Sequence, residues 1–216
     1  MWPGKEHTNI FQKYLIDISN YSAIKKIEAE GINDVYIIKD ERTNIIYIAK
    51  ILVLESTQNE QDRNIIKQEI INMIRLQHPT LNRFYGYSMI DFLNKNNVTF
   101  IMNYAENGSL ASVFQSIQKG STDIKFDNTI RQKILIGIAR GMMYLHQNGI
   151  IYRNLKPANI LLDSKYHPHI SDFFLSKIHH NDSPIYNAPE IIRGERFNNK
   201  VDVYSFGILM FEIITN

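Results

Sequence analysis

Residues 151–162 read Ile-Tyr-Arg-Asn-Leu-Lys-Pro-Ala-Asn-Ile-Leu-Leu, and they are the most informative stretch of the chain. An apolar run enters it, four polar residues lie at a bend, and a second apolar run leaves it. The polar residues are Arg153, Asn154, Lys156 and Asn159. The pattern predicts a polar loop carried between two buried segments.

The composition is that of a globular protein without disulfides. The chain has 216 residues, 44% of them apolar and 11% aromatic, which is enough to build a core. A net charge of +2 with dispersed Lys and Arg gives no indication of nucleic-acid or membrane binding. No cysteine is present, and no apolar run reaches the ~18 residues that a membrane span needs. We therefore expect a soluble, cytoplasmic protein that binds neither nucleic acid nor membrane.

The first half of the chain mixes short strands with one helix. Residues 35–38 and 45–49 are rich in β-branched and aromatic side chains and predict a hairpin, and residues 98–102 predict another strand. Between the hairpin and the strand at residues 98–102, apolar residues recur at helical spacing, and this pattern ends at Pro79. These are Ile66, Ile70, Met73 and Ile74.

The second half is mainly helical. Ser109 is a suitable N-cap for a helix over residues 110–118. A long helix follows, with Asn148-Gly149 as its stop signal. One face of this helix is formed by Ile130, Ile134, Ile138, Met142 and Leu145. The segment 201–215 is apolar on nearly every side, which predicts a helix surrounded by protein.

Taken together, the order and spacing of these motifs resemble the bilobal protein kinase fold over roughly residues 20–216. Residues 151–162 match the catalytic loop frame H-R-D-L-K-x-x-N, and residues 188–190 and 202–207 match two later family motifs. The resemblance implies an α+β fold with an N-terminal flank (1–19), a β-rich N-lobe with one helix and the hinge (20–104), and a mainly helical C-lobe (105–216). The C-lobe lacks the family's last helices, so the resemblance implies a C-terminally truncated domain.

The resemblance also implies a site for ATP. Lys50 matches the strand lysine that binds the phosphates, and Glu69, nine residues before His78-Pro79, matches the helix glutamate that pairs with it. Met102 falls at the gatekeeper position. The other matched positions are Val35 and Ala49 in the strands and Tyr104 and Ala105 in the hinge. Without these other matches, the alternative for Lys50 is a solvated lysine at a strand end, and the alternative for Glu69 is a solvated carboxylate on a helix.

Two further matches imply magnesium. Asn159 and Asp172 occupy the positions of the family's metal ligands, and such oxygen donors suit a hydrated Mg²⁺ brought in with a triphosphate. The structural alternative is a turn Asn and a turn Asp that cap local backbone. Lys156 and Ser183 resemble the serine/threonine branch, and the surrounding sequence is most similar to tyrosine-kinase-like serine/threonine kinases.

The family pattern breaks at the catalytic base. Asn154 replaces the Asp that accepts the substrate proton, and a neutral amide has no carboxylate to receive it. The phosphate-covering loop reads E-A-E-G-I-N-D-V, with Glu28, Glu30 and Asn33 in place of three glycines. Side chains there obstruct the approach of backbone amides to phosphate oxygens. Both changes predict weaker binding and little catalysis.

The magnesium loop and the segment after it also depart from the pattern. Phe174 replaces a glycine, which predicts a stiffer loop. Ser176, Ser183 and Tyr186 are candidate phosphorylation sites that Arg153 would meet, although such hydroxyls are more often solvated. The sequence also contains His179-His180 and His167-x-His169, but without cysteine or a third ligand these pairs do not favour a metal site.

These observations predict a pseudokinase that binds ATP and Mg²⁺ weakly, transfers little or no phosphate and signals through contacts with a protein partner that the sequence does not identify. Two alternatives stay open. One is an active serine/threonine kinase in which Lys50, Glu69, Asn159 and Asp172 suffice, and the other is a truncated copy without function. Asn154 separates the first alternative from the pseudokinase.

Overall fold

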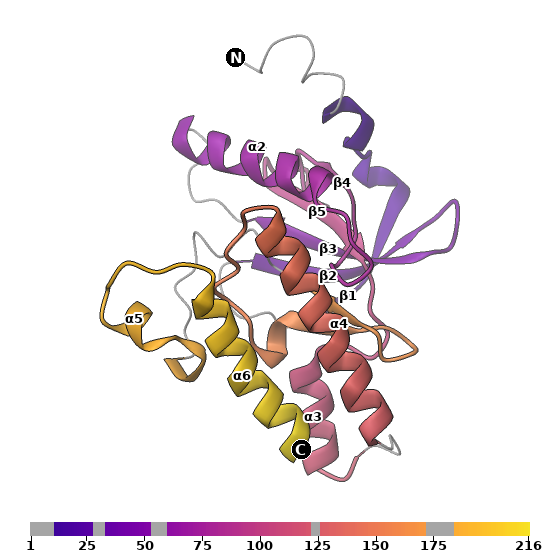
Figure 1. Cartoon of the computed structure of the whole chain (residues 1–216). Helices are drawn as coiled ribbons and strands as arrows, with labels where there is room; N and C mark the ends of the chain where they lie inside the picture. Colours follow the sequence, from indigo (N-terminus) through magenta and orange to yellow (C-terminus); the bar gives the residue numbers. More distant parts are fainter. Residues whose placement is uncertain (1–10, 28–32, 53–59, 122–125, 172–183) are drawn as a thin grey trace. The chain divides into compact units, whose positions relative to one another are not determined.

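The computed structural model describes residues 11–27, 33–52, 60–121, 126–171 and 184–216, and these residues form two compact units. The first unit contains residues 1–70 and 83–104, and the second contains residues 71–82 and 105–216. Figure 1 shows the β-rich first part of the chain and the mainly helical second part. The predicted α+β class is confirmed.

A five-stranded antiparallel sheet forms the first unit, with the strand order β1-β2-β3-β5-β4. The strands are β1 (Tyr21–Ile27), β2 (Asn33–Asp40), β3 (Ile46–Leu52), β4 (Phe84–Ser88) and β5 (Val98–Asn103), preceded by the 3-10 turn η1 (Ile18–Asn20). The predicted hairpin is β2 and β3, in which Lys39 pairs with Ile46. Asp40 stabilises its turn by accepting a hydrogen bond from the Arg42 amide at 2.8 Å.

Helix α2 (Glu60–Arg75) connects the two units, because the division falls between Ile70 and Ile71. The chain after it belongs to the second unit through its backbone contacts. The amide of Asn82 donates to the Ile170 carbonyl, and the amide of Ile170 donates to the Thr80 carbonyl, both at 2.8 Å. Residues 71–82 therefore belong to the second unit, together with residues 105–216.

The described part of the second unit contains the helices α3 to α6 and a short hairpin. Its elements are α3 (Leu110–Gln118), α4 (Asn128–Gln147), η2 (Pro157–Asn159), β6 (Ile160–Leu162), β7 (Pro168–Ile170), η4 (Pro184–Tyr186), α5 (Pro189–Ile192) and α6 (Lys200–Thr215). Ser109 caps α3 as predicted, since its side chain accepts from the Ser112 amide. Gly149, with φ +73°, follows the C-terminus of α4.

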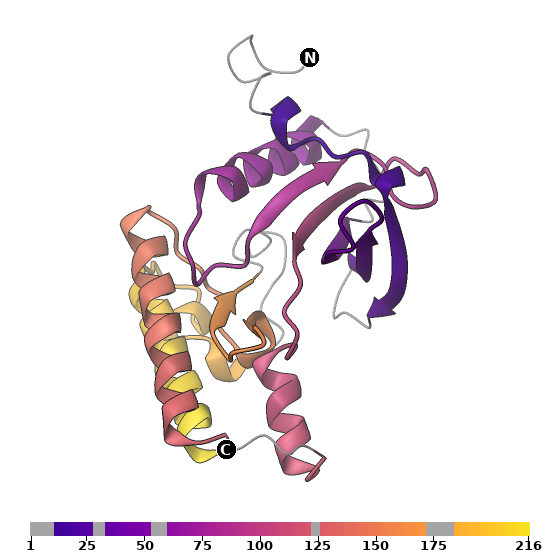
Figure 2. The same cartoon turned by 90° about the vertical axis from the view of Figure 1, so that its right-hand side faces the viewer.

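Two glycines bring the hairpin of β6 and β7 close to α4 (Figure 2). A Cβ atom at Gly137 would lie 2.4 Å from Cγ of Pro168, and one at Gly141 would lie 2.7 Å from Cδ1 of Ile170. Ile134 and Ile138, on the same side of α4, are fully buried. The predicted apolar face of α4 is thus the surface against which strand β7 packs.

Helix α6 is apolar but only partly covered in the described structure. Val201, Leu209 and Ile213 are buried, whereas Val203 and Phe211 are 55% and 66% exposed. The prediction of a helix surrounded by protein therefore holds for one face only. The buried face matters for the site because it presents Asp202 to the polar loop.

Candidate functional site

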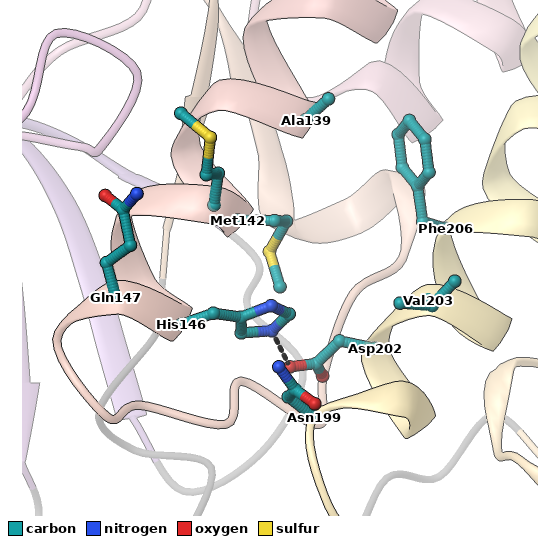
Figure 3. A pocket seen from close by; sticks show the side chains of 9 residues that line it. Ala139, Met142, His146, Gln147, Asn199, Asp202, Val203 and Phe206 are labelled. Atoms are coloured by element: carbon teal, nitrogen blue, oxygen red, sulfur yellow. Dashed lines mark hydrogen bonds and ion pairs between the residues drawn. The ribbon is translucent and has the colours of Figure 1, made fainter.

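The loop of residues 151–159 is anchored by one buried carboxylate. Asp202 on α6 is 1% exposed and accepts hydrogen bonds from the amides of Tyr152, at 2.9 Å, and Arg153, at 2.6 Å. His146 on α4 contacts the same carboxylate through Nε2 at 2.8 Å (Figure 3). Arg153 adopts φ +60°, a conformation uncommon outside glycine, so these bonds hold a turn that would not persist alone.

Tyr152 occupies the position at which the catalytic frame has a histidine. Its ring is fully buried, and its hydroxyl donates to the Ser171 carbonyl at 2.6 Å. The aromatic ring therefore fills the core and also ties the loop to the chain that follows β7. This geometry explains how the frame tolerates the change from histidine.

Asn154 and Asn159 are brought together by the bend. Nδ2 of Asn159 donates to the Asn154 backbone carbonyl at 2.8 Å, and Asn159 is 7% exposed. The Asn159 carbonyl in turn accepts from the amide of Ser171 at 2.9 Å. Asn159 is thus fixed from both sides, next to the chain that leads to Asp172.

The side chain of Asn154 has an unusual environment. Its Oδ1 atom is buried and accepts no hydrogen bond from the described residues. An amide oxygen is a hydrogen-bond acceptor with no useful basicity at neutral pH, so this residue cannot take up a proton as a carboxylate would. The described loop therefore carries an amide, and no carboxylate, at the position that the sequence resemblance assigns to a catalytic base.

In the first unit, strand register places three of the predicted nucleotide contacts, Val35, Lys50 and Met102, on one face. Val35 lies opposite Lys50, and Ile48 lies opposite Met102. Directly paired residues of antiparallel strands share a face, and residues two apart along a strand do so too. Val35 and Met102 therefore lie on the same face of the sheet as Lys50. The predicted nucleotide site needs this arrangement of one cation beside an apolar surface.

Ala49 is the exception among the predicted contacts. It is fully buried in a cluster with Ile18, Ile38 and Ile101, on the face of the sheet opposite Lys50. The reason is the two-residue period of a strand, which turns neighbouring side chains to opposite faces. Ile48, rather than Ala49, shares the face of Lys50, so the predicted contact between Ala49 and a nucleotide does not fit the register.

Glu69 lies on the buried side of α2 and is 5% exposed. Its neighbour Ile70 is 1% exposed and Met73 is 5% exposed, as the predicted apolar face requires. A buried carboxylate is costly unless it is paired, which favours the expected partnership with Lys50. That ion pair stays a prediction.

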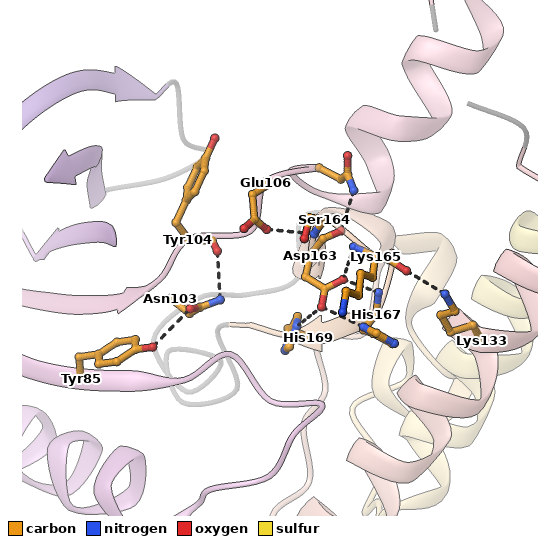
Figure 4. A network of polar contacts seen from close by, with 11 residues as sticks. Tyr85, Asn103, Tyr104, Glu106, Lys133, Asp163, Ser164, Lys165, His167 and His169 are labelled. Carbon is orange, nitrogen blue, oxygen red and sulfur yellow. Dashed lines mark hydrogen bonds and ion pairs between the residues drawn. The ribbon is translucent and has the colours of Figure 1, made fainter. Parts of the chain in front are cut away.

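The end of β5 is fixed by polar contacts before the chain enters the second unit. Nδ2 of Asn103 donates to the Tyr104 carbonyl at 3.0 Å (Figure 4). The Asn103 amide donates to the Arg83 carbonyl at 2.9 Å. Ala105, the next predicted hinge residue, is 6% exposed. The described hinge residues therefore have a defined backbone.

A network in the second unit was not predicted from the sequence. Asp163 accepts hydrogen bonds from the amides of Lys165 and His167, both at 2.8 Å, and lies between the rings of His167 and His169 (Figure 4). Burial opposes ionisation of Asp163, but the hydrogen bonds from His167 and Lys165 prevail and hold its pKa below the usual value. The sequence contained one indication of this network, because Asp163 precedes His167 by four residues in a turn. Among the described residues, no group of three or more His, Asp or Glu side chains is arranged to hold a metal ion.

Tyr186 is not an exposed phosphorylation site. It is 8% exposed, and its hydroxyl donates to both carboxylate oxygens of Glu212, at 2.7 and 2.8 Å. Its carbonyl accepts from Oγ of Ser205 at 2.7 Å. Burial and the bond to Glu212 raise the pKa of Tyr186 far above the usual value. Tyr186 therefore anchors η4 to α6, and the expectation of a solvated hydroxyl here is wrong.

Several predicted positions cannot be placed. Glu28, Glu30, Asp172, Phe174, Ser176, Ser183 and the pair His179-His180 lie outside the described residues.

A pocket of about 510 Å³ adjoins the Asp202 anchor and is lined by α4 and α6 residues, among them Met142, Val203 and Phe206 (Figure 3). No Lys or Arg lines it, so it is unsuited to phosphate groups and separate from the predicted chemistry.

Comparison with known proteins identifies the family. The sequence model of the protein kinase domain matches residues 21–216. The chain therefore belongs to the protein kinase domain family, and the predicted resemblance is confirmed.

The relatives include serine/threonine kinases. A probable LRR receptor-like serine/threonine-protein kinase of Arabidopsis thaliana is 32% identical over 212 residues, which are 92% of this chain and 21% of the relative. Cysteine-rich receptor-like protein kinase 7 of the same species is 35% identical over 212 residues, 91% of this chain and 30% of the relative. A probable serine/threonine-protein kinase of Dictyostelium discoideum is 34% identical over 182 residues, 81% of this chain and 19% of the relative. The chain thus spans less than a third of each.

None of the helices in the described parts of the chain combines the length and the apolar character needed to cross a membrane.

Proposed function

We propose that this chain is a pseudokinase domain that binds ATP and Mg²⁺ weakly, transfers little or no phosphate and acts through contacts with another protein. The observation that carries the proposal is Asn154, a neutral amide at the position of the catalytic base in a loop whose backbone is otherwise held by Asp202. Loss of a general base typically lowers a rate by ~10² to 10⁴, or roughly 3 to 5 kcal/mol of barrier.

The residues present suit a nucleotide. Lys50, with Val35 and Met102 on the same face of the sheet, provides one cation beside apolar side chains for a base. Asn159 and Asp172 would hold magnesium. Among the described residues the Asn159 side chain makes its hydrogen bond through Nδ2, which leaves its amide oxygen for that role. The bound metal would neutralise negative charge on the phosphates. Weak binding is expected because Glu28, Glu30 and Asn33 stand where glycines would let backbone amides approach phosphates.

An active serine/threonine kinase is the second candidate. The retained Lys50, Glu69, Asn159 and Asp172 favour it, as do relatives that are named serine/threonine kinases. Lys156 lies two residues from Asn154 and would still stabilise a transferring phosphate. The two candidates agree on nucleotide binding and differ in the rate of transfer.

Nucleotide binding is tested by thermal-shift titration of the whole chain with ATP, with and without magnesium. We expect a magnesium-dependent rise in melting temperature. Lys50→Ala is expected to abolish the rise because it removes the phosphate-binding cation, whereas Asn154→Ala is expected to leave it nearly unchanged. Equal nucleotide affinity of Lys50→Ala and the parent would refute the lysine site, and no shift in a folded parent would refute nucleotide binding.

A further inference from the structure

The segment Phe11–Ile18, which we call the strap, precedes the residues that match the family model but belongs to the folded first unit. Phe11 is 3% exposed and Ile18 is 5% exposed, although the strap is the first described segment of the chain (Figures 1 and 2). Lys13 and Leu15, between these two anchors, are exposed. The burial pattern indicates a segment held at both ends.

The strap covers the edge of the sheet. Strand β4 is an edge strand, and Leu15 forms a parallel bridge with its residue Tyr87. The Ile16 amide donates to the Tyr87 carbonyl at 2.8 Å, and the Tyr87 hydroxyl donates to the Phe11 carbonyl at 3.4 Å. Because an uncovered edge strand presents unpaired backbone groups, the strap satisfies part of that edge.

Gly86 makes this contact possible. A Cβ atom there would lie 2.5 Å from the backbone oxygen of Tyr14 and 2.5 Å from Cδ1 of Ile16. The Tyr14 ring stacks beside this point on Phe84, with ring centroids 5.9 Å apart. Gly86 does not have a positive φ, so the close approach of the strap, and not backbone conformation, is the reason for a glycine.

The strap also supports the strands that carry the predicted nucleotide contacts. Ile18 packs in the buried cluster with Ile38, Ala49 and Ile101, and Ile16 packs against that cluster. Ala49 immediately precedes Lys50, and Ile101 immediately precedes Met102. Core packing is dense, so a cavity left by removal of the strap side chains would shift the backbone of both β3 and β5.

We propose that the strap is a releasable support. Docked on β4, it fixes the strands of Lys50 and Met102 in the conformation that binds nucleotide, and released, it lowers the affinity for nucleotide. Release would break the backbone hydrogen bond from the Ile16 amide to the Tyr87 carbonyl and would expose the side chains of Phe11 and Ile18. The coupling to nucleotide rests on the proposed function, whereas the docking does not.

Docking is tested by thiol reactivity, because the chain has no cysteine of its own. Ile18→Cys is made in the otherwise unchanged full chain and in Gly86→Ala, and the rate of labelling by a thiol reagent is measured. Gly86→Ala is expected to raise the rate at least about tenfold, because the new methyl group cannot coexist with the docked strap. Leu15→Cys, at a position that is already 43% exposed, is expected to react at similar rates in both backgrounds.

Two further variants keep this test decisive. Gly207→Ala is the matched glycine control, because nothing lies within 4 Å of its built Cβ, and it should leave the labelling of Ile18→Cys unchanged. If Gly86→Ala does not fold, Tyr14→Ala, which removes the stacked ring without adding an atom, is expected to raise the rate in the same direction. Unchanged slow labelling in folded Gly86→Ala or Tyr14→Ala would overturn the docked strap.

The coupling is tested by ATP titration of Gly86→Ala and Gly207→Ala in the presence of magnesium. We expect a several-fold loss of ATP affinity in the first and none in the second. Faster labelling with undiminished ATP affinity would overturn the coupling while leaving the docked strap intact. If the folded parent binds no ATP, the proposed function and the coupling fail together, and the labelling rates alone decide the docking.

Discussion

Single residues decide whether the polar loop keeps its shape, and Asp202 is foremost among them. Asp202→Ala would leave the buried amide of Tyr152 and the amide of Arg153 without their acceptor. Each unsatisfied group costs about 1 to 3 kcal/mol, so for the two amides we expect a loss of roughly 2 to 6 kcal/mol of unfolding free energy. Urea denaturation measures this loss. Val203→Ala, at an exposed position on the same helix, should change the stability by less than about 0.5 kcal/mol.

Tyr186 provides a second test at the residue scale. Tyr186→Phe removes the hydrogen bonds to Glu212 and should destabilise the chain at pH 8 by about 1.5 to 3 kcal/mol. The folded-state pKa of Tyr186 is raised by burial and by Glu212, so its contribution is fully present below the unfolded pKa of ~10 and is lost as pH rises above that value. The stability difference between parent and Tyr186→Phe should therefore narrow above pH 10. A difference that stays constant at high pH would contradict the assigned hydrogen bonds.

The contact between α4 and the hairpin of β6 and β7 is tested through its glycines. Gly137→Ala would place a methyl group against the rigid ring of Pro168, and we expect it to destabilise the chain by about 1 to 3 kcal/mol. Gly207→Ala on α6 meets open space and should be neutral or stabilising by up to ~1 kcal/mol, because alanine is the better helix former. Thermal unfolding of both variants gives the comparison. Equal effects would show that the close packing at Gly137 is not needed.

At the same scale, the sequence predicted elements better than contacts. The hairpin, the cap at Ser109 and the helix stop at Gly149 follow from local preferences, which the structure keeps. The bond from Tyr186 to Glu212 joins residues 26 apart, so no local pattern could reveal it. The burial of Ala49 on the face opposite Lys50 depends on the two-residue period of the strand, which the order of residues in a motif does not show by itself.

At the scale of the whole molecule, the family and the α+β class could be predicted because several motifs recur in order over about 200 residues. The division of the chain was less predictable. Residues 71–82 follow α2 in sequence but pair with Ile170, a contact made across almost 90 residues. Asn154 itself was visible in the sequence, and the structure adds that its loop keeps a well-held backbone around the missing carboxylate.

The well-held loop has Asn154 at the position of the catalytic base, and this residue is proposed to limit phosphate transfer. The most direct measurement is the rate of phosphate transfer from ATP to casein, with magnesium, by the parent, by Asn154→Asp, and by Asn154→Asp combined with Lys50→Ala as the control. We predict background transfer by the parent, a gain of up to ~10² to 10⁴ in Asn154→Asp, and loss of that gain in the control. A parent that already transfers phosphate as fast as Asn154→Asp, at a rate well above the control, would contradict the account and identify an active kinase.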